Sequence, residues 1–189
     1  MPAFILVVTG ASGAGKTATV KELQARRVPG VRCFHFDSAG VPAIEIMERN
    51  HGSAEQWQAS MTNHWLARLA ALGSDVRVAV LDAQTRPSTV FAAPGAGEAW
   101  RAHVILFDCS AAVRAERLRG PRGQPELVDA RMDQWAAYLR READTLGLSV
   151  IDTSRLTVAE AADRLESLVL RLAASGAAAP NAVSRHGIV

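Results

Sequence analysis

Leu6-Val-Val-Thr-Gly-Ala-Ser-Gly-Ala-Gly-Lys-Thr17 is the stretch of this 189-residue chain that decides its fold. An apolar run leads straight into the pattern Gly10-x-x-x-x-Gly15-Lys16-Thr17, and helix-forming residues follow. This order of strand, glycine-rich turn and helix is the context of a phosphate-binding loop, because glycines let backbone N–H groups converge on an anion at the positive end of the helix. We therefore expect the whole loop to bind phosphates: Gly10, Ala11, Ser12, Gly13, Ala14, Gly15, Lys16 and Thr17.

Two side chains of this loop have a specific expected chemistry. Lys16 can reach the β- and γ-phosphates of a nucleoside triphosphate, and the Thr17 hydroxyl can bind the Mg²⁺ that such a nucleotide carries. The opening Thr9-Gly-Ala-Ser12 also resembles the dinucleotide-binding turn of short-chain dehydrogenases. That turn requires glycines two and four residues beyond Ser12, where this sequence has Ala14 and Lys16. The sequence therefore favours ATP or GTP over a dinucleotide.

Composition sets bounds on partners and location. A net charge of +2 gives no argument for nucleic acid or an acidic membrane surface as a partner. Cys33 and Cys109 lie far apart without CxxC spacing, which predicts small buried hydrophobic side chains in a reducing compartment. The sequence has no signal-peptide pattern and no apolar run long enough to cross a bilayer. We expect a cytoplasmic protein, and the sequence leaves its oligomeric state open.

Strand and helix patterns alternate along the chain, which predicts a three-layer α/β/α fold around a five-stranded parallel sheet. The expected strand order is 2-3-1-4-5, with 3-2-1-4-5 as the alternative. The expected strands are Phe4–Thr9, Val31–Phe36, Arg77–Leu81, His103–Phe107 and Leu148–Ile151. The expected helices are Gly15–Arg27, Ile44–Arg49, Ser53–Leu72, part of Ser88–Trp100, Ser110–Arg119, Glu126–Leu146 and a last one from the Thr157 cap to Leu172.

Helical spacing of apolar residues predicts which helix faces are buried. One domain is expected over residues 1–174, followed by a loose Ala/Gly/Pro-rich tail over 175–189. The expected buried stripes are Trp57, Met61, Trp65, Leu69 and Leu72 in the third helix, Val128, Met132, Trp135, Leu139 and Ala143 in the sixth, and Val158, Ala161, Leu165, Leu168 and Leu172 in the last.

Carboxylates follow several of the expected strands, and ligands of an open parallel sheet bind at these carboxyl ends. Asp37 can accept the proton of a substrate hydroxyl that attacks a γ-phosphate; the alternative is a cap on the turn at Ser38. Asp82 follows a fully apolar strand, which is the pattern of an aspartate that holds Mg²⁺, although many buried strands end in Asp. Asp108 and Asp152 are expected to cap the turns that follow them.

Two further groups of polar residues have a functional and a neutral interpretation. Gln84 and Arg86 lie just beyond Asp82 and suit a polar or anionic acceptor, or else a solvated loop. Four arginines lie in or just before a loop that is bounded by Gly and Pro and resembles a closing lid. Guanidinium groups can stabilise the negative charge that phosphoryl transfer spreads over the transferred group. The alternative is a solvated helix end. The four arginines are Arg114, Arg117, Arg119 and Arg122, with the lid over residues 119–125.

Nearly the whole chain resembles the small P-loop kinases of the nucleoside monophosphate kinase-like group, which includes shikimate, gluconate and adenylylsulfate kinases and chloramphenicol phosphotransferase. The resemblance depends on Gly10-x-x-Gly13-x-Gly15-Lys16-Thr17, on Asp37, on Arg117-Leu-x-x-x-Arg122 and on Ile151-Asp-Thr-Ser154. The first motif is highly specific for nucleotide phosphate, and the others are moderately specific.

The resemblance implies a role for each matching residue. Lys16 and Thr17 would handle the phosphates and Mg²⁺, and Asp37 would be the base that receives the proton of the acceptor. Arg117 would face the adenine, and Arg122 would be the lid arginine on the transferred phosphate. Residues 38–72 would form the acceptor-binding region, with Arg49 and Arg86 as candidate contacts.

The sequence also departs from the known members of this group. It lacks the paired-arginine site for nucleoside monophosphates, the glycine triplet of shikimate kinases and the long lid of adenylate kinases. We therefore expect an ATP- and Mg²⁺-dependent kinase that phosphorylates a hydroxyl of a small metabolite or antibiotic. A nucleoside or nucleotide kinase is the first alternative, and an ATPase or nucleotide sensor without an acceptor is the second. A guanine motif Asn-Lys-x-Asp is absent from the sequence.

Overall fold

A parallel sheet of five strands forms the centre of the molecule. The computed structural model describes residues 2, 4–97 and 100–175. Of the tail expected over 175–189, residues 176–189 lie outside this part of the chain. The strands pair in the order β2-β3-β1-β4-β5, every pair parallel, which confirms the first of the two expected orders. The strands are β1 (Phe4–Thr9), β2 (Val31–His35), β3 (Val78–Asp82), β4 (Arg101–Asp108) and β5 (Ser149–Asp152).

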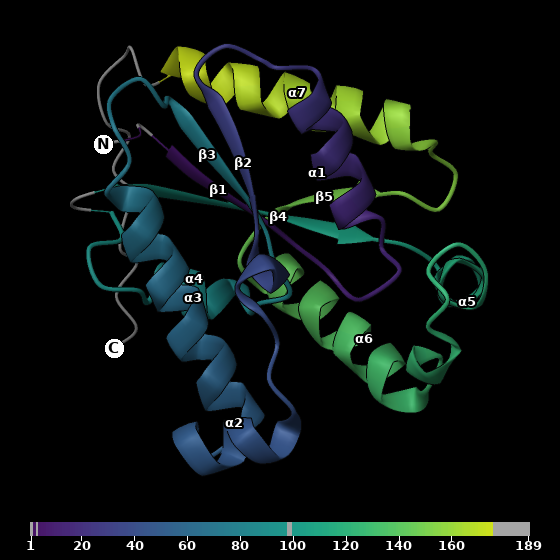
Figure 1. The fold of residues 1–189 in the computed structure, drawn as a ribbon. Helices are drawn as coiled ribbons and strands as arrows, with labels where there is room; N and C mark the ends of the chain where they lie inside the picture. The colour runs from purple at the N-terminus through teal and green to yellow at the C-terminus, as the bar shows by residue number, and fades with distance from the viewer. Residues whose placement is uncertain (1, 3, 98–99, 176–189) are drawn as a thin grey trace.

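Helices cover both faces of this sheet, so the three-layer α/β/α fold is also confirmed. In Figure 1, α1 and α7 lie on one face, and α3, α4 and α6 lie on the other. The helices are α1 (Lys16–Ala25), α2 (Ile44–His51), α3 (Ala54–Ala70), α4 (Pro87–Phe91), α5 (Ala111–Arg119), α6 (Ala130–Thr145) and α7 (Val158–Ser175), with short 3₁₀ helices η1 (Phe36–Ala39) and η2 (Pro125–Leu127).

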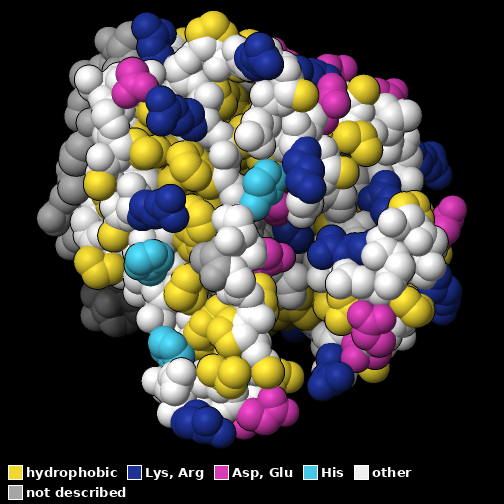
Figure 2. Space-filling view, in the orientation of Figure 1, with side chains coloured by type: hydrophobic (Ala, Val, Ile, Leu, Met, Phe, Trp, Pro, Cys, Tyr) yellow, Lys and Arg dark blue, Asp and Glu magenta, His cyan; other side chains and the backbone are white. Residues whose placement is uncertain are grey.

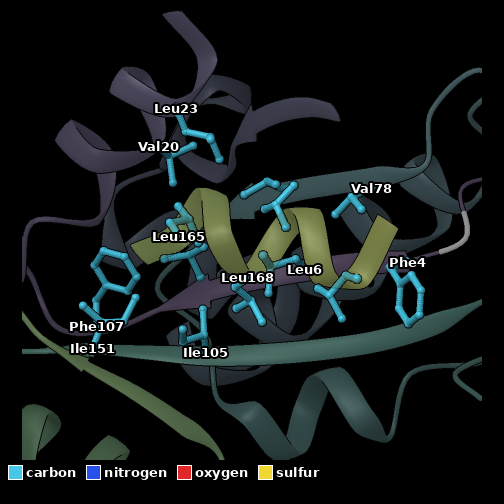
Figure 3. Close-up of a cluster of buried hydrophobic side chains, with 14 of the residues drawn as sticks. Phe4, Leu6, Val20, Leu23, Val78, Ile105, Phe107, Ile151, Leu165 and Leu168 are labelled. Atoms are coloured by element: carbon cyan, nitrogen blue, oxygen red, sulfur yellow. The ribbon is translucent and has the colours of Figure 1, made fainter. Parts of the chain in front are cut away.

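The central strand β1 is buried along its entire length, as its unbroken apolar sequence predicts for a strand with helices on both sides. Its successive side chains enter opposite layers. Leu6 packs with Leu165 and Leu168 of α7, as Figure 3 shows, whereas Ile5 and Val7 belong to the cluster that contains α3. The strand that leads to the phosphate loop is thereby fixed from both faces.

Two expectations about helices are wrong in detail. The helix expected at Glu126 begins only at Ala130, because Asp129 caps it: its Oδ1 accepts a hydrogen bond from Met132 N at 2.8 Å. Pro125–Leu127 forms a separate 3₁₀ turn, and Val128 lies outside any helix. In α7 the first expected core residue, Val158, is 46% exposed. The inward positions Leu139, Ala143, Ala161, Leu165, Leu168 and Leu172 are buried as expected.

The predicted burial of one face of α3 is confirmed for its largest side chains. Trp57, Trp65 and Leu69 of α3 are buried in the second core cluster, and Met61 and Leu72 are partly buried against it. No helix in the described part of the chain is both long and apolar enough to span a bilayer.

Candidate active site

The loop between β1 and α1 has the geometry of a phosphate-binding loop. Gly13 has φ +83°, and a Cβ there would lie 2.9 Å from Cγ of Arg114 and 3.1 Å from its carbonyl oxygen. At Gly10 a Cβ would collide with the carbonyl oxygen of Phe107. The glycine spacing read from the sequence thus corresponds to close packing of the loop against β4 and α5.

Lys16 is a buried cation in this loop, and only 7% of the residue is exposed. Its Nζ donates hydrogen bonds to the carbonyl oxygens of Gly10 (2.7 Å) and Ala11 (3.1 Å). Burial lowers the pKa of Lys16 to about 8; the charge of Arg122 lowers it further, while the carboxylates of Asp82 and Asp37 partly restore it. Lys16 therefore lies within electrostatic reach of three of the predicted site residues.

The two carboxylates come from the ends of neighbouring strands. Asp82 ends β3 and is 6% exposed, and its Oδ2 lies 3.0 Å from Nδ1 of His35, the last residue of β2. Asp37 lies on η1 directly after β2 and is exposed. Instead of Asp37, the side chain of Ser38 closes the local turn, by donating from Oγ to the carbonyl oxygen of His35 at 2.6 Å. The contact between His35 and Asp82 could not be predicted from the sequence pattern.

Arg117 is held against the phosphate loop by a residue whose role the sequence did not predict. Its Nη1 donates to Thr153 Oγ1 (2.9 Å) and to Gly13 O (3.3 Å), and its Nη2 donates to Thr153 O (2.8 Å). Thr153 is 2% exposed and donates from Oγ1 to Ala14 O at 2.9 Å. The motif at residues 151–154 was visible in the sequence, but not its contact with the loop.

The other arginines of this cluster have different surroundings. Arg122 is exposed, with its Nε donating to Gln124 within the expected lid, and Arg119 is exposed as well. Arg114, for which a solvated helix end was one interpretation, is 5% exposed: it pairs with Asp133 of α6 at 2.5 Å and donates to Cys109 O at 3.3 Å. That interpretation is wrong for Arg114, which joins the phosphate loop to α6.

The capping roles expected of two aspartates are present. Asp152 accepts a hydrogen bond from Ser154 N at 2.8 Å, and Asp108 accepts one from Cys109 N at 2.9 Å. Cys109 is buried, and Cys33 is partly buried.

The candidate acceptor residues are divided between two places. Gln84 adjoins the phosphate loop, because its Oε1 accepts a hydrogen bond from Ser12 Oγ at 3.1 Å. Arg86 follows it and pairs with Glu55 at 2.7 Å. Arg49 lies exposed on α2, which Figure 1 shows at the end of the molecule away from α1.

A cavity of about 470 Å³ adjoins the phosphate loop on the α7 side. Its lining includes Gly15, Lys16, Thr17, Arg117, Arg122 and Thr157. On the other side, Figure 2 shows a hollow between α3 and α6 that is bordered by charged side chains. Another hollow, of about 420 Å³, lies between α1 and the edge strand β2 and includes none of the predicted site residues. The cavity on the α7 side and the hollow between α3 and α6 are thus two separate spaces near the phosphate loop.

Among the described residues, no three His, Cys, Asp or Glu side chains gather into a set that would hold a metal ion by itself. A Thr17 hydroxyl and an Asp82 carboxylate are oxygen donors of the kind Mg²⁺ prefers, and Mg²⁺ at phosphate sites is usually bound by one or two carboxylates together with substrate phosphates and water. The donor set therefore fits Mg²⁺ that arrives with a nucleotide.

Several solved structures with the same architecture are kinases. A gluconokinase from Sinorhizobium meliloti 1021 aligns with a TM-score of 0.63 at 18% identity, over 92% of this chain and 95% of its own. A sugar kinase from Janibacter sp. HTCC2649 aligns with 0.60 at 20% identity, over 93% and 98%. A shikimate kinase from Acinetobacter baumannii, in complex with shikimate, aligns with 0.55 at 16% identity, over 90% and 94%. The chain has the P-loop kinase fold.

A deoxyadenosine kinase from M. mycoides with bound dATP shares this fold as well, with a TM-score of 0.57 at 12% identity, over 88% of this chain and 98% of its own. No protein-family model and no curated protein sequence matches the chain. At these identities the likeness concerns the fold, in which the parallel order β2-β3-β1 places the carboxyl ends of these three strands along one edge of the sheet.

Proposed function

We propose that this protein is an ATP-dependent kinase that transfers the γ-phosphate to a hydroxyl group of a small molecule. One observation carries the proposal: the buried Lys16 lies in the phosphate loop after β1, at the same edge of the sheet at which Asp82 ends β3 and Asp37 follows β2. A phosphate-binding cation, two carboxylates and a lid arginine are the parts that phosphoryl transfer requires.

The surroundings of Lys16 fit a bound triphosphate. Two of the three ammonium hydrogens are donated to loop carbonyls, which leaves one for a phosphate oxygen. Burial makes the charge of Lys16 costly, and phosphate anions offset that cost. Thr17 and Asp82 would hold Mg²⁺, which would supply positive charge against the negative charge that develops during transfer.

Asp37 is the proposed general base. It follows the end of β2 and is exposed, so a substrate hydroxyl has access to it. As the hydroxyl oxygen forms a bond to the γ-phosphorus, its proton moves to a carboxylate oxygen of Asp37. The bond between the γ-phosphorus and the β,γ-bridging oxygen breaks, and ADP leaves with that electron pair.

The two arginines of the proposed nucleotide side have separate roles. Arg117 is fixed by Thr153 and lines the cavity beside the loop, which suits a guanidinium that stacks on the adenine face. Arg122 lies in the proposed lid, residues 119–125, where closure would bring it to the transferred phosphate. The acceptor contacts that we propose are Asp37, Gln84 and Arg86, with Arg49 of α2 as a further candidate.

The comparisons support a kinase and leave its acceptor undetermined. Three of the similar structures are a shikimate kinase, a gluconokinase and a sugar kinase, and phosphorylation of a hydroxylated metabolite or antibiotic is our first candidate. The deoxyadenosine kinase favours a nucleoside as the second candidate.

The test is γ-phosphate transfer from ATP to a panel of sugars, sugar acids, hydroxylated antibiotics and nucleosides. We expect Asp37→Asn to lower kcat by about 10²- to 10⁴-fold, because it removes a general base. The control is Asp75→Asn, which removes an exposed carboxylate that pairs with Arg32 at 3.1 Å. Unchanged transfer in Asp37→Asn would end the general-base assignment. Nucleotide binding without turnover on any acceptor would indicate a sensor instead.

A further inference from the structure

A ladder of polar contacts joins α3 to the loop that follows β3. Residues 55, 58 and 62 are spaced three and four apart, so they lie on one face of α3, and each contacts a different residue of the loop. The three rungs of this polar ladder are Thr62 Oγ1 with Thr85 Oγ1 (2.8 Å), Gln58 Nε2 with Gln84 O (2.6 Å) and Glu55 Oε1 with Arg86 Nη1 (2.7 Å).

The inner rungs fix the loop to the phosphate-binding strand. Thr62 and Thr85 are fully buried, and Thr9 at the end of β1 donates from Oγ1 to Thr85 O at 2.5 Å. Ser12 of the phosphate loop donates to the side chain of Gln84. Because these contacts do not involve the outermost rung, the loop keeps its position whether or not Glu55 pairs with Arg86.

The outermost rung is the ion pair between Glu55 and Arg86. The Glu55 side chain is exposed to solvent, whereas the Arg86 side chain packs against aromatic rings. The Glu55 side chain is 65% exposed, against 24% for Arg86. The guanidinium carbon lies 5.4 Å from the ring centroid of Trp135 and 5.3 Å from that of Tyr138, and the two rings stack 5.5 Å apart. The aromatic rings of α6 therefore hold the guanidinium independently of its carboxylate partner.

Glu55 also interacts favourably with the N-terminus of its own helix. It lies in the first turn of α3, which Ser53 caps by accepting a hydrogen bond from Gln56 N. A carboxylate at a helix N-terminus is stabilised by the helix dipole, so Glu55 keeps a favourable interaction after it leaves Arg86. An exposed ion pair of this kind stabilises the protein little by itself and is easily exchanged.

We propose that Glu55 is a specificity-determining residue that occupies Arg86 in the free protein, and that the acceptor carries a carboxylate or phosphate group that replaces it. An anionic acceptor exchanges one ion pair for another, whereas a neutral acceptor leaves the pair between Glu55 and Arg86 in place and gains nothing from Arg86. Planar guanidinium groups bind both kinds of anion in a bidentate manner. This inference rests on the proposed function, because it assigns the hollow beside Arg86 to the acceptor.

The first experiment measures anion binding without needing the natural acceptor. Inorganic phosphate, gluconate and the neutral polyol glucitol are titrated by calorimetry into protein saturated with Mg²⁺ and a non-hydrolysable ATP analogue, so that the phosphate loop is filled. We expect Glu55→Gln to bind an anion about two- to fivefold more tightly than the parent, since it loses the competing carboxylate. Arg86→Gln should lose anion binding, and glucitol should bind equally to both variants.

A matched control separates this effect from the general loss of a surface ion pair. Glu22→Gln removes the exposed carboxylate that lies 3.5 Å from Arg26 on α1, and it should leave all three affinities unchanged. A preference for phosphate identifies a phosphorylated acceptor, and a preference for gluconate over glucitol identifies a carboxylate. Equal anion affinities in the parent and in Glu55→Gln, or no anion binding in either, overturn the proposal.

Phosphoryl transfer to the same compounds distinguishes this failure from failure of the kinase itself. If transfer occurs but Glu55→Gln leaves the KM of anionic acceptors unchanged, the kinase stands and the role of Glu55 does not. If no compound is phosphorylated while anion affinity still changes with Glu55, the anion site stands and the kinase does not. Thermal unfolding of each variant confirms that it is folded.

Discussion

The phosphate loop and the loop after β3 lie beside each other, since β1 and β3 are neighbouring strands, yet they are built in different ways. The phosphate loop is shaped by its own backbone. Its glycines take positive φ values, and Lys16 donates to carbonyls only five and six residues away. The loop after β3 is held by side chains from α3 and β1, including Thr9, which lies 76 residues from Thr85 along the chain.

This difference shows where a short motif is sufficient and where it is not. A loop made from local contacts needs only the right residues at the right spacing, so its function can be recognised in the sequence. A loop positioned by distant side chains depends on the complete fold, and its polar residues have no distinctive spacing. Substitution of a polar side chain should therefore act mainly on catalysis in the phosphate loop and mainly on stability in the loop after β3, whereas added bulk at a glycine of the phosphate loop should act on both.

The largest expected effect is on the phosphate loop. Lys16→Met should lower kcat for γ-phosphate transfer by about 10³-fold, because it removes a buried cation aimed at the transferred charge. The free energy of unfolding should not fall, since a buried charge is lost together with its desolvation cost. Steady-state kinetics and denaturant unfolding check the two parts. Activity within tenfold of the parent would contradict the assignment of this loop.

The same lysine gives a pH dependence of stability. Burial lowers the pKa of Lys16 from 10.5 to about 8, so between these values the unfolded chain binds more protons than the folded one. Stability should therefore rise with pH across this window, by roughly 3 kcal/mol from Lys16 alone. We expect the parent to gain this much relative to Lys16→Met between pH 8 and 10.5. The raised pKa of Cys33 opposes the rise equally in both proteins and cancels in the difference.

The fold could be predicted from the sequence because its signals are periodic and local. The apolar run of β1 and the glycine spacing of the phosphate loop each act within a few residues. The start of α6 was predicted wrongly because two local signals conflict there. A helical pattern extends over Val128, but the aspartate cap at residue 129 and the 3₁₀ turn before it decide the boundary.

The candidate site could be predicted only in part. The motif indicates Lys16 and Thr17, and strand ends indicate Asp37 and Asp82. The partners of these residues could not be predicted, because the contact of Arg117 with Thr153 spans 36 positions. For the same reason, Glu55 and Gln58 had no signal in the sequence: their function arises only when α3 packs beside the loop after β3.

A smaller effect is expected from crowding the phosphate loop. Gly13→Ala places a methyl group 2.9 Å from Cγ of Arg114 at a positive φ, and should destabilise the protein by about 2–3 kcal/mol while weakening ATP binding. Gly147→Ala is the matched control. It has φ +64° but no atom within 4 Å of the new Cβ, so only the backbone strain remains, about 1 kcal/mol. Equal losses in denaturant unfolding would show that crowding by Arg114 contributes nothing.

The smallest expected effect tests the inner rung of the polar ladder. Thr62 donates to Gln58 O at 2.8 Å, so the hydroxyl of Thr85 must donate to Thr62. Thr62→Val leaves that buried donor without its acceptor and should cost about 1–2 kcal/mol in the free energy of unfolding.

Thr145→Val is the control for this variant, because Thr145 makes the same bond to the carbonyl four residues earlier, at 2.8 Å, but on the exposed end of α6. Adding Thr85→Val to Thr62→Val removes both hydroxyls and should restore part of the lost stability. A double-mutant cycle measures this coupling. If the losses of Thr62→Val and Thr85→Val are simply additive, the two hydroxyls do not stabilise each other, and this rung does not hold the loop after β3.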